Sequence, residues 1–152
     1  MEIKAKVRKL VRKYKTRNPF EMISGMNVIL VLYPLKGVRG FYQYFQRNNI
    51  IYIDEALSDT DKAFVLAHEI GHMLLHKKSN AIFMDTRTQF KTTRYELEAD
   101  KFAMELLISD EFLEENKLYT TEQLSRMTGY HKELIELRLQ KLTHTTLNKI
   151  RK

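Results

Sequence analysis

Two histidines and a glutamate in the middle of the chain have the spacing of a catalytic metal site. The segment is His68-Glu69-Ile70-Gly71-His72. On a helix, residues four apart lie on one face, so both imidazoles can reach the same ion. Zinc binds neutral imidazole nitrogens and, in catalytic sites, keeps one position open for water. Glu69 would take the proton of that water, so the pattern indicates a zinc peptidase with Glu69 as general base.

A third zinc ligand is expected on a second helix, and residues 95–103 offer two glutamates for it. Glu96 shares a predicted helix face with Asp100 and with two alanines, whose small side chains would let this helix approach the zinc helix closely. Glu98 shares its face with charged residues and is predicted to be solvated. We therefore assign Glu96 as the third ligand and Asp100 as the carboxylate that orients a ligand imidazole. The alternative is that both are ordinary surface acids.

The surroundings of the histidine motif matter because a motif this short also occurs by chance. The predicted helix is apolar on nearly all sides. Burying two histidines and a glutamate there would cost free energy unless these polar groups have a bonding partner. The alternative is a pair of hydrogen-bonded core histidines. His76 follows His72 too closely to be the third histidine of the metzincin pattern, and it is predicted to be a helix C-terminal residue near the rim of the site.

The elements that must position these residues are mostly helices. The predicted helices are residues 2–15, Pro19 to about Gly25, a helix from the N-cap Ser58 to Leu75, Tyr95–Ile108, and three short segments within 110–142. The predicted strands are residues 27–33, 40–46 and 50–54, with a tight turn at Asn48-Asn49 and an irregular connection at 80–92. Helices around one small antiparallel three-stranded sheet give an α+β fold. We place a domain boundary between residues 117 and 118, with 118–152 as a helical extension.

The amino-acid composition limits the classes of protein to which this chain can belong. The chain has 152 residues, is 43% hydrophobic and 30% charged, and contains no cysteine. It shows neither a secretory signal nor a run of about 20 apolar residues that could cross a membrane, so we expect a protein of the reducing cytoplasm. The net charge is +7, and the basic excess lies within residues 1–17. This basic arm could contact nucleic acid, although we favour the solvated face of an amphipathic helix.

The two motifs together resemble a known family. AHEIGHMLLH (67–76), followed by YELEADKFAMELL (95–107), is similar to the ImmA/IrrE-type metallopeptidases, and the similarity extends over nearly the whole chain. The resemblance implies a zincin-like domain of the gluzincin kind, with zinc held by His68, His72 and Glu96 and with Glu69 as the catalyst. It also implies a biological role, because members of this family are often encoded by prophages and cleave a helix-turn-helix repressor.

These observations lead to hypotheses of different classes. The first is a cytoplasmic zinc endopeptidase that cuts a regulatory protein, with the substrate added as a strand at residues 40–46 or 50–54. The second is a zinc-stabilised regulator that binds DNA or a protein and cuts nothing, and it draws on the basic arm and on a helix-turn-helix pattern at 120–142. A third, a purely structural metal site, would have no use for a buried Glu69. We favour the first and interpret 120–142 as a packing or substrate-docking segment, because glutamates lie where its second helix would contact bases.

Overall fold

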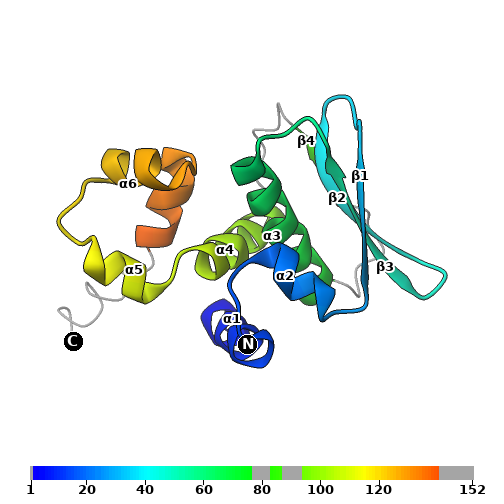
Figure 1. Ribbon diagram of the computed structural model, residues 1–152, viewed down its shortest axis with the longest axis horizontal. Helices are drawn as coiled ribbons and strands as arrows, with labels where there is room; N and C mark the ends of the chain where they lie inside the picture. The colour runs from blue at the N-terminus through cyan, green and yellow to red at the C-terminus, as the bar shows by residue number, and fades with distance from the viewer. Residues whose placement is uncertain (1, 77–82, 87–93, 141–152) are drawn as a thin grey trace. The chain divides into compact units, whose positions relative to one another are not determined.

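The computed structural model describes residues 2–76, 83–86 and 94–140, and the chain forms two compact units, residues 1–107 and 108–152. The first unit contains α1 (Ile3–Tyr14), α2 (Pro19–Ser24), β1 (Val28–Tyr33), β2 (Val38–Phe45), β3 (Asn48–Asp54), α3 (Asp59–Leu75), β4 (Phe83–Thr86) and α4 (Arg94–Leu107). The second unit contains α5 (Asp110–Glu115), α6 (Thr121–Thr128) and a helix at residues 132–140. The predicted α+β class is confirmed (Figure 1). Within the described residues, no helix is both long enough and apolar enough to cross a membrane.

The sheet of the first unit is mixed, so the predicted antiparallel three-stranded sheet is wrong. Its strand order is β1-β3-β2-β4. β3 pairs in parallel with β1 and antiparallel with β2, and β2 pairs antiparallel with β4. Strands that follow one another in sequence are neighbours in about two-thirds of cases, and β1 and β2 are an exception because β3 lies between them. The fourth strand, β4, falls within residues 80–92, which were expected to be irregular.

The hairpin between β2 and β3 turns two residues earlier than predicted. Gln46 and Arg47 both have positive φ, 48° and 66°, as in a two-residue type I′ turn. Asparagine, aspartate and glycine take this backbone conformation most often, and for that reason the turn was predicted at Asn48-Asn49. These two asparagines instead begin β3.

Neither strand expected to offer a binding edge lies at the edge of the sheet. β2 and β3 each have a neighbouring strand on both sides, and the edge strands are β1 and β4. An extended peptide adds to a sheet through the unpaired backbone groups of an edge strand. The hypothesis that a substrate adds a strand at residues 40–46 or 50–54 is therefore wrong.

Helix α3 begins where the sequence predicts and packs closely on the sheet. The Asp61 backbone N–H donates to Ser58 Oγ at 3.1 Å, which confirms Ser58 as the N-cap. In β2, Gly40 faces the helix, because a Cβ atom added to Gly40 would lie 2.6 Å from Val65 Cγ1 and 2.7 Å from the carbonyl oxygen of Tyr52. The missing side chain lets the backbone of β2 approach α3, and this contact fixes the position of the helix that carries the histidines.

Helix α4 is held between α3 and α1 in the first unit, and α3 separates it from the sheet (Figure 1). The chain just after α1 fixes the far end of α4. There, Arg17 Nη1 donates to the carbonyl oxygens of Glu105 and Leu106 at 2.9 and 3.1 Å. These carbonyls belong to the last turn of the helix that carries Glu96 and Asp100, so one residue of the basic arm helps to position the site.

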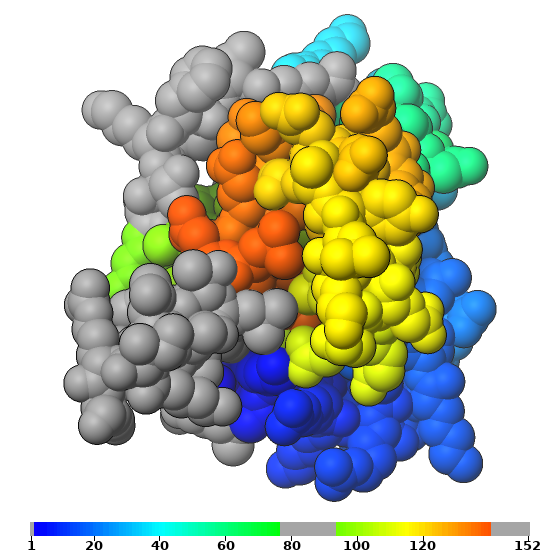
Figure 2. Space-filling model, turned by 90° about the vertical axis from the view of Figure 1, so that its left-hand side faces the viewer, coloured from blue at the N-terminus to red at the C-terminus, as the bar shows by residue number. Residues whose placement is uncertain are grey.

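The second unit, yellow and orange in Figure 2, consists of short helices that bury Leu113, Leu124 and Ile135. A capping box of Thr120 and Gln123 begins α6, and Gly129, with φ 84°, ends it. The buried Arg138 donates from Nη2 to Asp110 Oδ1 at 2.7 Å. A helix, a turn and a second helix are therefore present within 120–140.

Candidate metal centre

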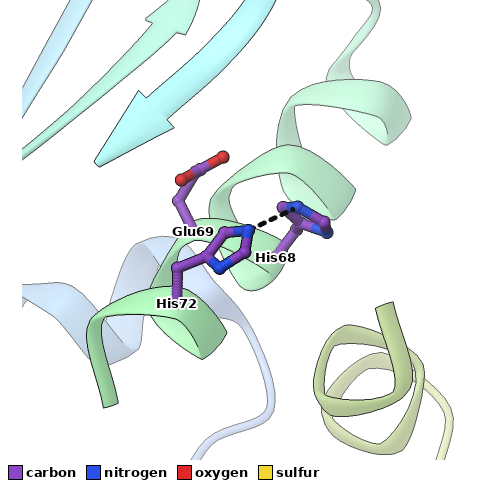
Figure 3. A group of neighbouring side chains, drawn as sticks. All are labelled: His68, Glu69 and His72. Atoms are coloured by element: carbon purple, nitrogen blue, oxygen red, sulfur yellow. Dashed lines mark hydrogen bonds between the residues drawn. The ribbon is translucent and has the colours of Figure 1, made fainter. Parts of the chain in front are cut away.

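Helix α3 brings the two histidines and the glutamate of the motif to one buried place (Figure 3). His68 and His72 lie one turn apart, and their Nε2 atoms are 3.1 Å from each other. The two rings are nearly perpendicular, at 82°. Glu69 projects from the same helix, and a ligand atom of each of the three residues lies within 4.8 Å of the other two. All three side chains are buried, and polar groups buried in this way need partners that compensate for lost water.

Helix α4 contributes two carboxylates to the same place. Glu96 Oε2 lies 3.2 Å from His68 Nε2, and Glu96 Oε1 lies 2.7 Å from His72 Nε2. Asp100 Oδ1 is 2.8 Å from Nδ1, the other ring nitrogen of His68. The structure therefore brings together every residue that the sequence singled out for the site: His68, Glu69, His72, Glu96 and Asp100.

The two helices meet at small residues. Gly71 packs against the ring of Phe102, because a Cβ atom added to Gly71 would lie 3.1–3.2 Å from three atoms of that side chain. On α4, Ala99 and Ala103 are completely buried. This close approach is the one expected from the alanines beside Glu96, and it allows the short glutamate side chain to reach both histidines.

The charges in this cluster favour a cation among the ligand atoms. Burial lowers the pKa of His68, but hydrogen bonds with Asp100 and Glu96 outweigh burial and hold that pKa well above its usual value. Burial raises the pKa of Glu96, but hydrogen bonds with His68 and His72 lower it to about 2. Burial also lowers the pKa of His72. The pKa shifts of His68 and Glu96 have the directions expected where an imidazole and a carboxylate lie close together and each favours the charged form of the other.

The donor set fits a zinc ion. The Asp100 carboxylate can only accept a hydrogen bond, so His68 Nδ1–H donates to it and His68 Nε2 is left for a proton or a metal ion. Two nitrogens bound to a tetrahedral zinc ion are about 3.3 Å apart, because each Zn–N distance is about 2.0–2.1 Å. The two Nε2 atoms here are 3.1 Å apart, and a Glu96 oxygen lies against each of them. The two histidines and Glu96 can therefore hold zinc with little movement.

Two residues beside this centre, His76 and Glu98, were not predicted from the sequence to take part in it. Nδ1 of His76 lies 3.0 Å from His72 Nδ1, and Nε2 of His76 lies 3.0 Å from Glu98 Oε2. His76 was expected to be a helix C-terminal residue near the rim of the site; it is the C-cap of α3, and only 6% of the residue is exposed. Glu98 was expected to be solvated; its side chain is 29% exposed, and its hydrogen bond with His76 lowers its pKa. The signal was present in the sequence, because residues 68, 72 and 76 share one helix face.

Known proteins are similar to this chain over most of its length. Residues 24–140 match the family described as the IrrE N-terminal-like domain. The chain is 40% identical over 139 residues to immunity region protein 2 of Bacillus phage phi105, which covers 90% of this chain and 88% of that protein. It is 29% identical over 135 residues to the metallopeptidase ImmA of Bacillus subtilis (strain 168), which covers 88% of this chain and 75% of ImmA.

Proposed function

Because this chain is a metallopeptidase that belongs to the IrrE N-terminal-like family, we propose that it is a zinc-dependent endopeptidase with His68, His72 and Glu96 as zinc ligands. The observation that carries the proposal is the convergence of three side chains, two imidazoles and one carboxylate. Both Nε2 atoms and both Glu96 oxygens lie within 3.2 Å of a neighbouring ligand atom. Imidazole nitrogen and carboxylate oxygen are ligands that zinc takes in catalytic sites.

We assign Glu69 as the general base, since Glu96 already contacts both histidines and is the better placed ligand. When bound, zinc supplies a Lewis acid that acidifies a water molecule and polarises the peptide carbonyl. Glu69 accepts a proton as the water oxygen attacks the carbonyl carbon. It then donates that proton to the amide nitrogen as the C–N bond breaks, which leaves a carboxylic acid and an amine. The burial of Glu69 supports this role, because electrostatic interactions are stronger away from water.

Asp100 supports the metal centre through its contact with His68. Its hydrogen bond with His68 Nδ1 fixes the ring orientation and the position of the ring hydrogen. We therefore give Asp100 a positioning role and Glu69 the proton transfer.

The substrate that we propose is a regulatory protein, namely a helix-turn-helix repressor of a phage or another mobile element. Two observations support this choice. The relative from phage phi105 is named for an immunity region, and the paired motifs resemble a family that cleaves such repressors.

A second function has one observation in its favour. The helix α1 exposes basic side chains, among them Lys9, Arg12 and Lys13, and such a surface can attract nucleic acid. A regulator of this kind would bind DNA in a salt-sensitive manner and would do so equally well after Glu69→Gln.

The experiment that tests the proposal compares the wild type with Glu69→Gln. Each protein is incubated with a candidate repressor from the same mobile element, the fragments are identified by mass spectrometry, and bound zinc is measured. We expect about one zinc per chain in both proteins, with cleavage lost only in Glu69→Gln. Glu111→Gln, which replaces an exposed glutamate, is the matched control and should cleave normally. Cleavage by Glu69→Gln would exclude this mechanism, and a wild type that binds no zinc would exclude the zinc site.

A further inference from the structure

A chain of hydrogen bonds runs from His72 away from the metal centre. His76 lies one turn after His72, and its side chain is 2% exposed. The Nδ1 atoms of these two histidines are 3.0 Å apart, and His76 Nε2 is 3.0 Å from Glu98 Oε2 on α4. Glu98 Oε1 accepts a further hydrogen bond from Arg94 Nε at 2.9 Å. The chain thus connects a buried imidazole to Arg94, whose side chain is 88% exposed.

The chemistry of these groups sets the direction of each hydrogen bond in this series. An ionised carboxylate only accepts hydrogen bonds, so His76 Nε2 carries the hydrogen and donates it to Glu98. Nδ1 of a neutral His76 ring is then an acceptor, and His72 Nδ1–H donates to it. With a metal bound, His72 Nε2 would direct its lone pair at the ion instead of donating a hydrogen to Glu96, and this is the atom that faces His68 and Glu96. Glu98 therefore determines, through His76, which nitrogen of His72 is available to a metal.

We propose that His76 and Glu98 are positioning residues that hold His72 with the lone pair of Nε2 directed at the metal. This inference rests on the proposed function, in which His72 is a zinc ligand. The two ligand histidines are then held in different ways. A carboxylate, Asp100, holds His68 directly, whereas a carboxylate holds His72 through a second imidazole. Groups that fix the second nitrogen of a ligand histidine typically change metal affinity by about 10–100-fold when they are replaced.

The test is the zinc affinity of the full chain, measured by competition with a chelator. His76→Phe keeps an aromatic ring but removes the acceptor, so we expect zinc affinity to fall by about 10–100-fold. His76→Asn restores an acceptor on a short side chain and should lose less affinity than His76→Phe. Glu98→Gln removes the charge that orients His76 and should also lower the affinity. Arg94→Ala removes only an exposed partner, and it should change the affinity by no more than about twofold.

A second measurement reports the direction of the hydrogen bonds, which a merely structural role would not set. In nitrogen NMR spectra of the zinc-loaded protein, we expect His72 to carry its hydrogen on Nδ1 and His76 to carry its hydrogen on Nε2. A hydrogen on Nδ1 of neutral His76 would overturn the inference. This measurement and Glu98→Gln decide the matter if His76→Phe does not fold.

The outcomes separate this inference from the function on which it rests. Unchanged zinc affinity in both His76→Phe and Glu98→Gln, with wild-type helical content by circular dichroism, would overturn the positioning role and leave the peptidase intact. A wild-type chain that binds no zinc would overturn both. Graded losses along the chain of hydrogen bonds, with the expected tautomers, would support the inference.

Discussion

Arg17→Ala should destabilise the first unit by about 2 kcal/mol, although Arg17 belongs to the basic N-terminal arm. Its Nη1 atom donates to the carbonyl oxygens of Glu105 and Leu106 at 2.9 and 3.1 Å. Hydrogen bonds that involve a charged group contribute about 1.5–3 kcal/mol, and a positive charge at a helix C-terminus adds about 0.3–1 kcal/mol. Arg17 is half-buried, so water screens part of this interaction and the lower part of the combined range, about 2 kcal/mol, is expected.

The assay is urea unfolding followed by circular dichroism. With an m-value of about 2 kcal/mol/M, a loss of about 2 kcal/mol lowers the unfolding midpoint by about 1 M. Arg17→Lys keeps the charge but not the planar donor group, so it should lower the midpoint by roughly half as much. Arg12→Ala removes the same charge from an exposed position on α1, and such a substitution should shift the midpoint by no more than about 0.25 M. Equal shifts for Arg17→Ala and Arg12→Ala would refute the reasoning, because net charge would then account for both.

Two more substitutions test the contacts that position the site. Gly40→Ala should lower the free energy of unfolding by about 1–3 kcal/mol, because the added methyl group would lie 2.6 Å from Val65 Cγ1 and 2.7 Å from the Tyr52 carbonyl oxygen; a thermal midpoint equal to that of the wild type would contradict this contact. Asp100→Asn should lower zinc affinity by about 10–100-fold, because the carboxylate that accepts from His68 Nδ1 is lost, and a chelator titration that gives the wild-type affinity would remove Asp100 from the site.

The proximity of the proposed metal ligands could be predicted from the sequence because the spacings within each helix are local. His68 and His72 are four residues apart, as are Glu96 and Asp100, so the helix period alone places each pair on one face. The choice of Glu96 over Glu98 also followed from which face carries small residues. The role of Glu98 could not be predicted in this way. It depends on His76, which reaches it from the end of a different helix.

The strand order could not be predicted for a related reason. A composition rich in β-branched, aliphatic and aromatic residues identifies the segments 27–33, 40–46 and 50–54 as strands, and all three are present. It carries no information about which strands are neighbours. The hairpin position failed because Gln46 and Arg47 adopt positive φ, which residues of these types rarely do.

The electrostatics of the site explain why a buried group of histidines and acids can be part of the core. The hydrogen bonds of Glu96 lower its pKa to about 2 even though burial raises it, and the hydrogen bonds of His68 raise its pKa well above the usual value even though burial lowers it. Both pKa shifts favour a positive charge beside an ionised carboxylate. Without that positive charge, the negative charge buried in the core would be uncompensated. A divalent ion among the same atoms would supply that charge and displace the proton from His68. Metal binding and the stability of the first unit should therefore be coupled through this one cluster.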